Sequence, residues 1–304
     1  MRTLLYKART EPAELIILNS LNHRMQLSKF DQQNYSNLRK GFEGELLFDS
    51  LTNNLESDCL VLNNLLLKTN NQTFQIDTLI ITNNLVYLCE IKNYEGDYYY
   101  KSDRLLTKDR LEISNPLIQL TRSESLLSQL LHKLNYTFPI QGLVIFVNPH
   151  FTLYQAPTDK PFIFPTQLDR FLKNLNSNQS KLQDQHKKLA DKLANLHIEE
   201  INHQQIPLFN YQDLSKGILC TECSSSITKI EGMKCICTVC GNDELVETAV
   251  LRNIKEFKLL FPQKKITTNQ IFEWCNIIPK KRRVQKILHR NFKQYSVRQW
   301  TYYE

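Results

Sequence analysis

Glycine and long apolar runs are both scarce in this sequence. Glycine occurs 7 times in 304 residues, whereas average usage of about 7% would give roughly 21, so we expect each glycine to occupy a position that requires one. No segment approaches the roughly 18 uninterrupted apolar residues of a membrane span, which excludes a transmembrane protein and predicts no membrane partner. The N-terminal segment also lacks an apolar core of signal-peptide length, so we expect a cytoplasmic protein with reduced thiols.

The positive charge is confined to one end of the chain. The net charge is +7, but residues 251–304 alone carry 13 Lys and Arg against 3 acids, a net of +10. Subtracting this from the total leaves −3 for residues 1–250. A basic tail on a mildly acidic body indicates a polyanionic partner.

The hydrophobic pattern predicts an α/β fold class. Helices are expected at residues 10–28 and 36–54, strands at 60–67, 74–82 and 85–93, a helix ending near 134 that Asn115 caps, and a strand at 142–147. A length of 304 residues is roughly twice that of a usual domain. We expect an α/β core at residues 1–175, a helical connector at 176–214, a cysteine-bearing module at 215–248 and a basic helical tail at 249–304.

The most informative segment is a predicted hairpin between residues 75 and 92. Asparagine tolerates a positive φ, so Asn83-Asn84 suits a two-residue turn that pairs Thr82 with Leu85. Side chains alternate across a strand, so this register places four polar side chains on one face. The pairs are Gln75 opposite Lys92 and Asp77 opposite Glu90.

The two opposed carboxylates indicate a metal site. Asp77 and Glu90 would repel one another unless a cation lay between them, and a hard divalent cation such as Mg²⁺ takes carboxylate, water and phosphate oxygens as ligands. Lys92 could then orient or activate the attacking water and stabilise charge on a phosphate. An alternative of equal weight is a surface hairpin in which Lys92 pairs with both acids.

Four ordered motifs, spread over about residues 38–150, resemble those of a known family. The pattern resembles the nuclease-related domain, NERD, which is similar to the restriction-endonuclease-like PD-(D/E)XK nucleases. The resemblance implies a restriction-endonuclease-like core, a mixed central sheet flanked by helices, with Ile76 in the place of a proline. The motifs are Gly41-Phe42-Glu43-Gly44-Glu45, Gln75-Ile76-Asp77, Glu90-Ile91-Lys92-Asn93-Tyr94-Glu95-Gly96 and Asn115-Pro116-Leu117-Ile118-Gln119.

The resemblance also implies a role for each matched polar residue. Asp77 and Glu90 would bind Mg²⁺ or Mn²⁺, and Lys92 would be the catalytic lysine. Glu45 would be a supporting acid from the first core helix, and Gln119 a site residue at the start of the next helix. Without the resemblance, Glu45 is one of several acids on an amphipathic helix and Gln119 is an ordinary helix residue.

Five of the eight cysteines fall between residues 220 and 240. Cys220 and Cys223 form one C-x-x-C knuckle, and Cys237 and Cys240 form a second, a spacing that allows a hairpin to bring four thiolates to one Zn²⁺. This resembles a zinc ribbon with a structural site. Cys235 is an alternative ligand, but only Cys237 completes the second knuckle.

The basic tail predicts three short helices, at residues 249–260, 268–275 and 279–292, which weakly resemble a helix-turn-helix. Aromatic residues after the third helix could stack on bases or form a small wing. The alternative is a solvated charged helix with a packed aromatic tail. The residues expected to bind nucleic acid are Lys280, Lys281, Arg282, Arg283, Lys286 and Arg290.

Together these features predict a cytoplasmic, Mg²⁺-dependent nuclease that hydrolyses phosphodiester bonds in DNA and holds it with a zinc ribbon and a basic tail. The alternative is a non-catalytic DNA-binding or regulatory protein on a nuclease scaffold. An RNA-processing role is a third possibility, because no feature reads a 2′-hydroxyl. The sequence does not indicate an oligomeric state.

Overall fold

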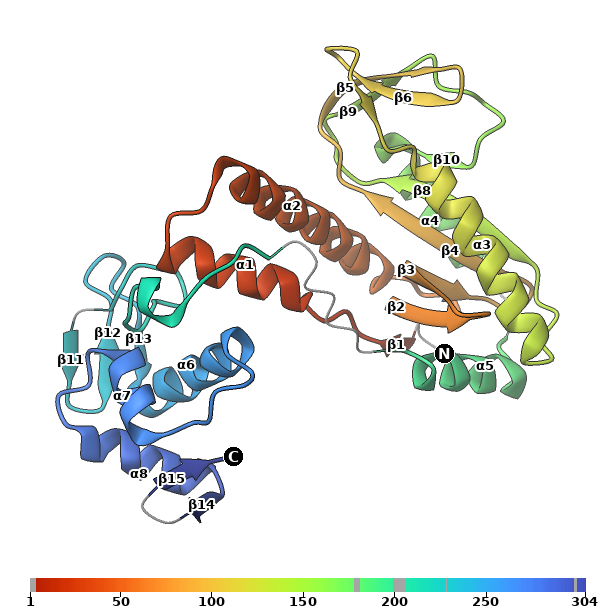
Figure 1. The fold of residues 1–304 in the computed structure, drawn as a ribbon. Helices are drawn as coiled ribbons and strands as arrows, with labels where there is room; N and C mark the ends of the chain where they lie inside the picture. Colours follow the sequence, from red (N-terminus) through yellow and green to blue (C-terminus); the bar gives the residue numbers. More distant parts are fainter. Residues whose placement is uncertain (1–3, 178–180, 199–205, 228, 298–299) are drawn as a thin grey trace. The chain divides into compact units, whose positions relative to one another are not determined.

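The computed structural model describes residues 4–177, 181–198, 206–227, 229–297 and 300–304 (Figure 1). The chain forms two compact units. Unit 1 contains Met1–Glu11 and Ser36–Ile201, and unit 2 contains Pro12–Tyr35 and Asn202–Glu304. Each unit therefore combines stretches of chain that are separate in sequence, which differs from the consecutive domains that the sequence suggests.

Unit 1 is built on a mixed sheet with the strand order β1-β2-β3-β4-β8-β10. The neighbours β2, β3 and β4 are antiparallel, whereas β1 runs parallel to β2 and β8 runs parallel to both β4 and β10. The strands are β1 (Leu4–Lys7), β2 (Leu60–Thr69), β3 (Gln72–Ile81), β4 (Val86–Lys92), β8 (Ile140–Phe146) and β10 (Phe162–Ile163).

Helices cover both faces of this sheet, as Figure 1 shows. One face carries α3 (Pro116–Lys133) and α5 (Asp184–Asn195), which pack in a cluster with Leu79 of β3. The adjacent Ile80 points to the opposite face, where its cluster contains Phe48 of α2 (Lys29–Thr52) and Leu175 of α4 (Leu168–Ser177). This arrangement confirms the predicted α/β fold class, a mixed sheet flanked by helices.

Helix α5 differs from the predicted connector. Its polar composition suggests a solvated helix, yet Leu189 and Leu193 are fully buried against the sheet. The buried His186 ring adds a polar attachment: its Nδ1 accepts the Gln183 amide at 2.9 Å, and its Nε2 donates to the Asn83 carbonyl at 2.9 Å. An apolar stripe on a mostly charged helix is therefore enough to place α5 in the core, beside the turn of the β3–β4 hairpin.

The chain leaves β4 into a second, smaller sheet with the order β7-β6-β5-β9. Its strands were not expected from the sequence, because they are short and rich in tyrosine rather than in alternating aliphatic residues. The rings of Tyr94 and Tyr98 stack with their centroids 5.3 Å apart, and the centroids of the Tyr98 and Phe151 rings lie 5.4 Å apart. The strands are β5 (Gly96–Lys101), β6 (Arg104–Thr107), β7 (Glu112–Ile113) and β9 (Phe151–Tyr154).

Unit 2 has its own hydrophobic core, to which the ribbon strands, the C-terminal helices and α1 all contribute. None of the described helices, in this unit or in unit 1, is long and apolar enough to cross a membrane. The elements are α1 (Ala13–Arg24), β11 (Lys229–Glu231), β12 (Lys234–Ile236), β13 (Asp243–Leu245), α6 (Val246–Leu260), α7 (Thr268–Cys275), α8 (Lys281–Asn291), β14 (Gln294–Val297) and β15 (Trp300–Tyr303).

Helix α1 belongs to unit 2 because of a buried arginine. The Arg24 guanidinium lies over the Trp274 ring at 4.1 Å and forms an ion pair with Glu256 at 2.6 Å. It also donates to the carbonyls of Ser215 and Gly217 at 2.8 and 3.1 Å. The hydrogen-bond partners of Arg24 lie 191 to 232 positions further along the sequence. No local sequence pattern therefore indicates that α1 packs against these segments.

Gly44 is a glycine whose position has a clear physical reason. A Cβ at this point of α2 would lie 2.4 Å from the Cβ of Asn93, the residue that follows β4. The absent side chain lets α2 approach the end of β4 directly. Gly41, one turn earlier in the same helix, has no atom within 4 Å of the equivalent position.

We expect Gly44→Ala to destabilise unit 1 by about 1–3 kcal/mol, because helix and loop must separate to admit the methyl group. Gly41→Ala is the matched control and should be neutral or stabilising by up to about 1 kcal/mol, since alanine favours the helix. Urea unfolding of both variants measures the difference. Equal stability of the two would show that the α2–Asn93 contact is not tight.

Candidate functional site

The β3–β4 hairpin has the predicted register. Thr78 pairs with Cys89 and Ile81 pairs with Val86. This is the register predicted from a turn that pairs Thr82 with Leu85. Thr82 donates its amide to the Leu85 carbonyl at 3.0 Å, which confirms the two-residue turn at Asn83-Asn84. Neither Asn83 nor Asn84 has a positive φ, so the turn has the predicted length and register but not the backbone conformation from which it was predicted.

The ladder between these strands ends at Thr78 and Cys89, directly before the acidic residues. The alternation along β3 also changes phase there: Ile76 and Leu79, three residues apart, pack in the same cluster. Instead of continuing the ladder, the Asp77 carboxylate accepts the Ile91 amide at 2.8 Å. Asp77 is thereby held against β4, next to Glu90.

The change of phase removes Gln75 from the site. Its side-chain amide is exposed and donates to the Asn64 Oδ1 at 3.0 Å, while its backbone pairs with Leu66 of β2. The prediction that Gln75 faces Lys92 is wrong, because strict alternation does not hold across Asp77.

Glu90 and Lys92 form the second part of the site. Their side chains form an ion pair at 2.7 Å, with Glu90 only 2% exposed and Lys92 20% exposed. They lie two residues apart on β4, so both side chains project from one face. The carboxylate is thus enclosed, and the ammonium beside it retains access to solvent.

Helix α2 adds two more acids, Glu45 and Asp49, one turn apart on one face. Arg9, from the segment after β1, lies between this helix and β3 with a side chain that is 1% exposed. It binds Asp49 through two nitrogens at 2.9 and 3.0 Å and Glu45 at 2.5 Å. A further nitrogen contact reaches the backbone carbonyl of Asp77 at 2.8 Å.

Sequence reasoning missed Arg9. It is a single arginine in a polar N-terminal stretch, and its partners lie 36 to 69 positions later. The parallel pairing of β1 with β2 brings it to the site, and nothing local in the sequence signals that pairing. Arg9 fixes the position of Glu45 relative to Asp77.

Burial dominates the electrostatics of this group. It raises the pKa of Glu45 to about 7 and of Glu90 to about 7, and the neighbouring Asp77 carboxylate adds to both shifts. Burial likewise raises the pKa of Asp77. For Lys92, burial lowers the pKa, but the combined effects of Glu90, Tyr94 and Asp77 outweigh this and the net shift is upward. Without a further cation, burial therefore favours the neutral forms of these carboxyl groups.

The donor set fits a hard divalent cation. Four carboxylates face two cationic side chains in this group, so full ionisation leaves two negative charges that are not balanced. The atoms available are carboxylate oxygens, the ligands that Mg²⁺ and Mn²⁺ prefer. The carboxylates of Asp77 and Glu90 could hold the ion directly, and a bound cation would favour their charged forms.

Gln119 is not brought into this group. It lies in the first turns of α3 and is exposed, and within the described part of the chain no contact joins it to the carboxylates. The N-cap of this helix is as predicted: the Asn115 side chain accepts the Leu117 amide at 3.0 Å.

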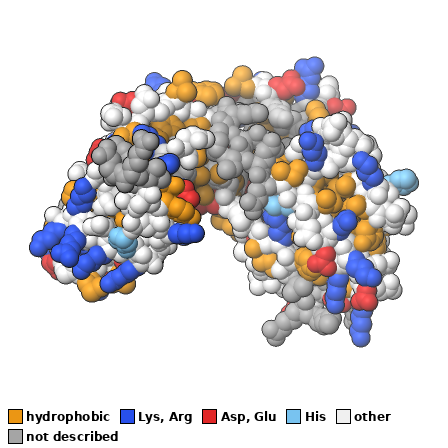
Figure 2. Space-filling model, turned by 60° about the horizontal axis from the view of Figure 1, so that its bottom comes forward, with side chains coloured by type: hydrophobic (Ala, Val, Ile, Leu, Met, Phe, Trp, Pro, Cys, Tyr) orange, Lys and Arg blue, Asp and Glu red, His pale blue; other side chains and the backbone are white. Residues whose placement is uncertain are grey.

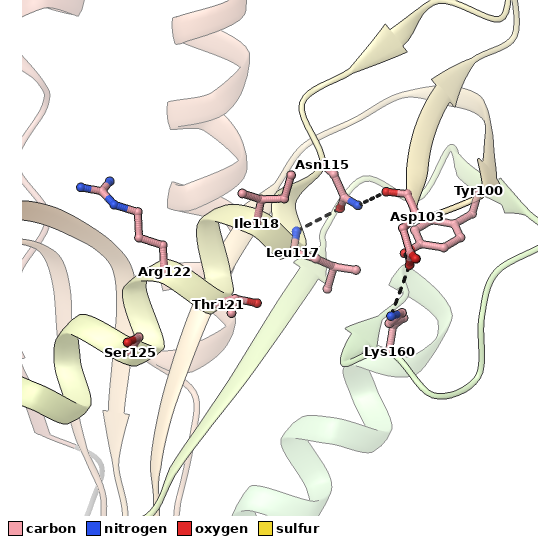
Figure 3. A pocket seen from close by; sticks show the side chains of 9 residues that line it. All are labelled: Tyr100, Asp103, Asn115, Leu117, Ile118, Thr121, Arg122, Ser125 and Lys160. Atoms are coloured by element: carbon pink, nitrogen blue, oxygen red, sulfur yellow. Dashed lines mark hydrogen bonds and ion pairs between the residues drawn. The ribbon is translucent and has the colours of Figure 1, made fainter.

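A shallow pocket of about 560 Å³ lies beside the start of α3 (Figure 3). Asp103 and Lys160 form an ion pair at one end at 3.3 Å, with the Tyr100 hydroxyl donating to Asp103 at 2.9 Å. Arg122 lies at the other end and donates to the Thr73 carbonyl at 3.1 Å. None of the four clustered carboxylates lines this pocket.

In unit 2, Cys220, Cys223, Cys237 and Cys240 converge so that their sulfur atoms all lie within 4.8 Å of one another. The Cys220–Cys240 and Cys223–Cys237 sulfur distances are 3.6 and 3.5 Å. Four sulfurs at about 2.3 Å from a tetrahedral zinc would be separated by about 3.8 Å. The geometry therefore fits a tetrahedral metal ion with all four positions filled by thiolates.

Cys235 is excluded from this cluster. It lies on β12, is fully buried in the core of unit 2, and burial raises its thiol pKa to about 11. The preference for Cys237 is confirmed. Gly232 and Gly241 have positive φ values of 53° and 79°, as tight turns require.

The six basic residues predicted to bind nucleic acid lie at the start of α8 and along it. Arg283 donates to the Gly232 carbonyl at 2.9 Å, and Arg290 lies 3.8 Å from Glu247. The other four are exposed.

We expect Arg9→Ala to destabilise unit 1 by about 3–5 kcal/mol, because it leaves Glu45 and Asp49 buried without a partner. Arg39→Ala is the control, since Arg39 pairs with Glu43 on the exposed face of the same region at 2.9 Å and should contribute no more than about 0.5 kcal/mol. Chemical denaturation measures both. A loss below about 1 kcal/mol for Arg9→Ala would contradict the role given to this residue.

We expect one zinc ion per chain by elemental analysis, with Cys237→Ser losing the ion and the fold of the ribbon. Cys235→Ala, two residues from the ligand Cys237 but buried in the core, should keep the metal. Retention of zinc by Cys237→Ser together with its loss from Cys235→Ala would show that the ligand set is wrong.

One of the comparisons with known proteins finds a match. Residues 40–147 match the family model of NERD, the nuclease-related domain, and this range contains Glu45, Asp77, Glu90, Lys92 and Gln119. No curated protein and no solved structure matches the chain. The matched range covers the α/β core from α2 to β8, including the hairpin and its acids. Over residues 40–147 the chain therefore carries a nuclease-related domain of the NERD family.

Proposed function

We propose that unit 1 is a metal-dependent nuclease that hydrolyses phosphodiester bonds in DNA, with Mg²⁺ or Mn²⁺ as its cofactor. The observation that carries this proposal is the pair of buried carboxylates, Asp77 and Glu90, with the partly exposed Glu45 and Lys92 beside them. Burying several carboxylates together destabilises a fold unless they serve a ligand. A divalent cation and the phosphate oxygens it binds would account for the arrangement.

Each side chain has a distinct part in this proposal. Asp77 and Glu90 would hold the metal ion, and Asp77 is already oriented by the Ile91 amide. Glu45 would support the site from α2, where Arg9 fixes its carboxylate. The bound metal would polarise the phosphate and lower the pKa of a water ligand.

Lys92 would act at the solvent edge of the site. Its ammonium forms an ion pair with Glu90 at 2.7 Å. A cation bound by Glu90 would replace this ion pair and leave the ammonium free to contact the substrate. As a compact cation it could then hydrogen-bond the attacking water or a non-bridging phosphate oxygen. While the ion pair with Glu90 is in place, Glu90 raises the pKa of Lys92, although burial opposes this.

Unit 2 would hold the nucleic acid. A zinc ion on the four cysteines would stabilise the ribbon, and the exposed cations of α8 would contact phosphates, mostly without regard to sequence and with strong salt dependence. Four thiolate ligands require reduced cysteines, so we also propose a cytoplasmic, reducing location.

The test is degradation of plasmid and oligonucleotide DNA by purified protein with Mg²⁺ or Mn²⁺. We expect Asp77→Asn and Lys92→Ala to lose at least about 100-fold of the rate, as removal of a metal ligand or of a charge-stabilising group does in comparable sites. Glu45→Gln should lose less, since Glu45 supports the site without being assigned as a ligand.

Glu43→Gln and Lys101→Ala are matched controls, because both residues are exposed and neighbour the site in sequence. They should keep full activity. Cleavage that survives both Asp77→Asn and Lys92→Ala would eliminate this assignment. DNA binding without cleavage under any divalent metal would instead favour the non-catalytic, regulatory alternative.

A further inference from the structure

The C-terminal part of unit 2 has the three helices predicted from the sequence, and the structure adds how the strands around them pair. Three helices, α6, α7 and α8, are followed by the antiparallel hairpin β14–β15. Between α6 and α7, Ile266 forms a bridge to Tyr303 of β15, with the Tyr303 amide donating to the Ile266 carbonyl at 2.9 Å. The order is helix, single-residue bridge, helix, helix and two-stranded wing, with the bridge residue Ile266 paired to the last strand. This is the arrangement of a winged helix.

The packing holds α8 by one side only. Val284, Ile287 and Leu288 are buried, at a spacing that marks a single stripe. They join Trp274 of α7 and Tyr303 of the wing in one core. Helix α7 ends at Asn276, whose φ of 44° places it in the left-handed region, so the chain turns before α8 begins.

The opposite side of α8 is exposed and carries donors and acceptors at helical spacing. Arg282, Gln285, Lys286 and His289 are all exposed, and they recur at intervals of three to four residues. Lys281, one turn before Gln285, extends the same surface. The polar side of α8 is therefore a continuous strip.

The charge of this strip lacks internal compensation. Helix α8 contains no acidic residue, and among the described residues no acid lies within ion-pair distance of Lys281, Arg282 or Lys286. Cations in the first turn also oppose the helix dipole, which favours negative charge there. In Figure 2, basic side chains gather along one edge of this unit. The surface is suited to a polyanion.

We propose that this module is a winged helix that binds duplex DNA, with α8 in the major groove and the β14–β15 wing against the backbone. An α-helix fits the major groove, where Gln285 can pair with an adenine and Arg282 or Lys286 with a guanine. Binding to single strands would call for aromatic platforms instead, and the exposed strip of α8 carries no Tyr, Trp or Phe. The proposal deepens the proposed function, on which it rests, by naming duplex DNA as the partner of unit 2.

The experiment uses the full chain with Asp77→Asn, so that DNA stays intact during binding. Selection from a random-sequence duplex library should enrich a defined site. The enriched duplex should bind at least about 10-fold more tightly than either of its single strands. Gln285→Ala should reduce the preference for the enriched site over a scrambled duplex by roughly 5- to 100-fold, with affinity for the scrambled duplex unchanged.

Lys281→Ala and Lys286→Ala should weaken binding to every duplex and lower the salt slope by about 1 each. The matched control is Lys187→Ala with Lys188→Ala, two exposed lysines of α5 in unit 1, which should leave binding unchanged. Circular dichroism checks that the α8 variants, all at exposed positions, keep their fold.

Tighter binding to single strands or RNA, or equal binding by the α8 variants and the parent, would overturn the proposal. An unenriched library would overturn base readout by Gln285. These outcomes are separable from a failure of the nuclease assignment. If the chain with the native Asp77 binds duplexes through α8 but never cleaves DNA, the winged-helix proposal stands and the nuclease proposal fails. If the chain cleaves DNA equally well with and without the α8 substitutions, only the winged-helix proposal fails.

Discussion

The crowding of negative charge at the end of the β3–β4 hairpin constrains the rest of unit 1. Asp77, Glu90, Glu45 and Asp49 are largely buried together, and such a group destabilises a fold unless cations compensate it. Arg9 and Lys92 do so from opposite sides, one fully buried and one at the solvent edge. Arg9 has several fixed partners, so it neutralises the helix acids permanently. Lys92 has a single carboxylate partner, so a stronger cation can displace it.

Several features of the fold follow from holding these groups at short range. Gly44 lets α2 come within contact of Asn93, immediately after Lys92, so the helix that bears Glu45 sits against the strand that bears Glu90. The ladder between β3 and β4 stops at Thr78 and Cys89, which frees the Asp77 carboxylate to accept the Ile91 amide. Helix α5 secures the other end of the hairpin through His186. The site thus occupies the irregular end of an otherwise regular hairpin.

Features set by local chemistry could be read from the sequence, and those set by distant contacts could not. The Asn83-Asn84 turn determined the register, and the C-x-x-C spacing determined the cysteine cluster. Arg9, by contrast, meets its partners through a parallel strand pairing, and Arg24 reaches Glu256 across 232 positions. The Ile266–Tyr303 bridge that completes the wing is equally remote from any local pattern. The role of Gln119 was predicted from the resemblance alone and stays a prediction. The structure leaves this residue exposed.

The central claim is that the carboxylate group of unit 1 is a divalent-metal site. Crystals of the protein soaked in Mn²⁺ test it most directly, because anomalous scattering identifies the ion and its ligands. We expect an anomalous peak within about 2.0–2.3 Å of oxygens of both Asp77 and Glu90, with the Lys92 ammonium moved away from Glu90. No peak at millimolar Mn²⁺, with the 2.7 Å ion pair between Lys92 and Glu90 still in place, would contradict it.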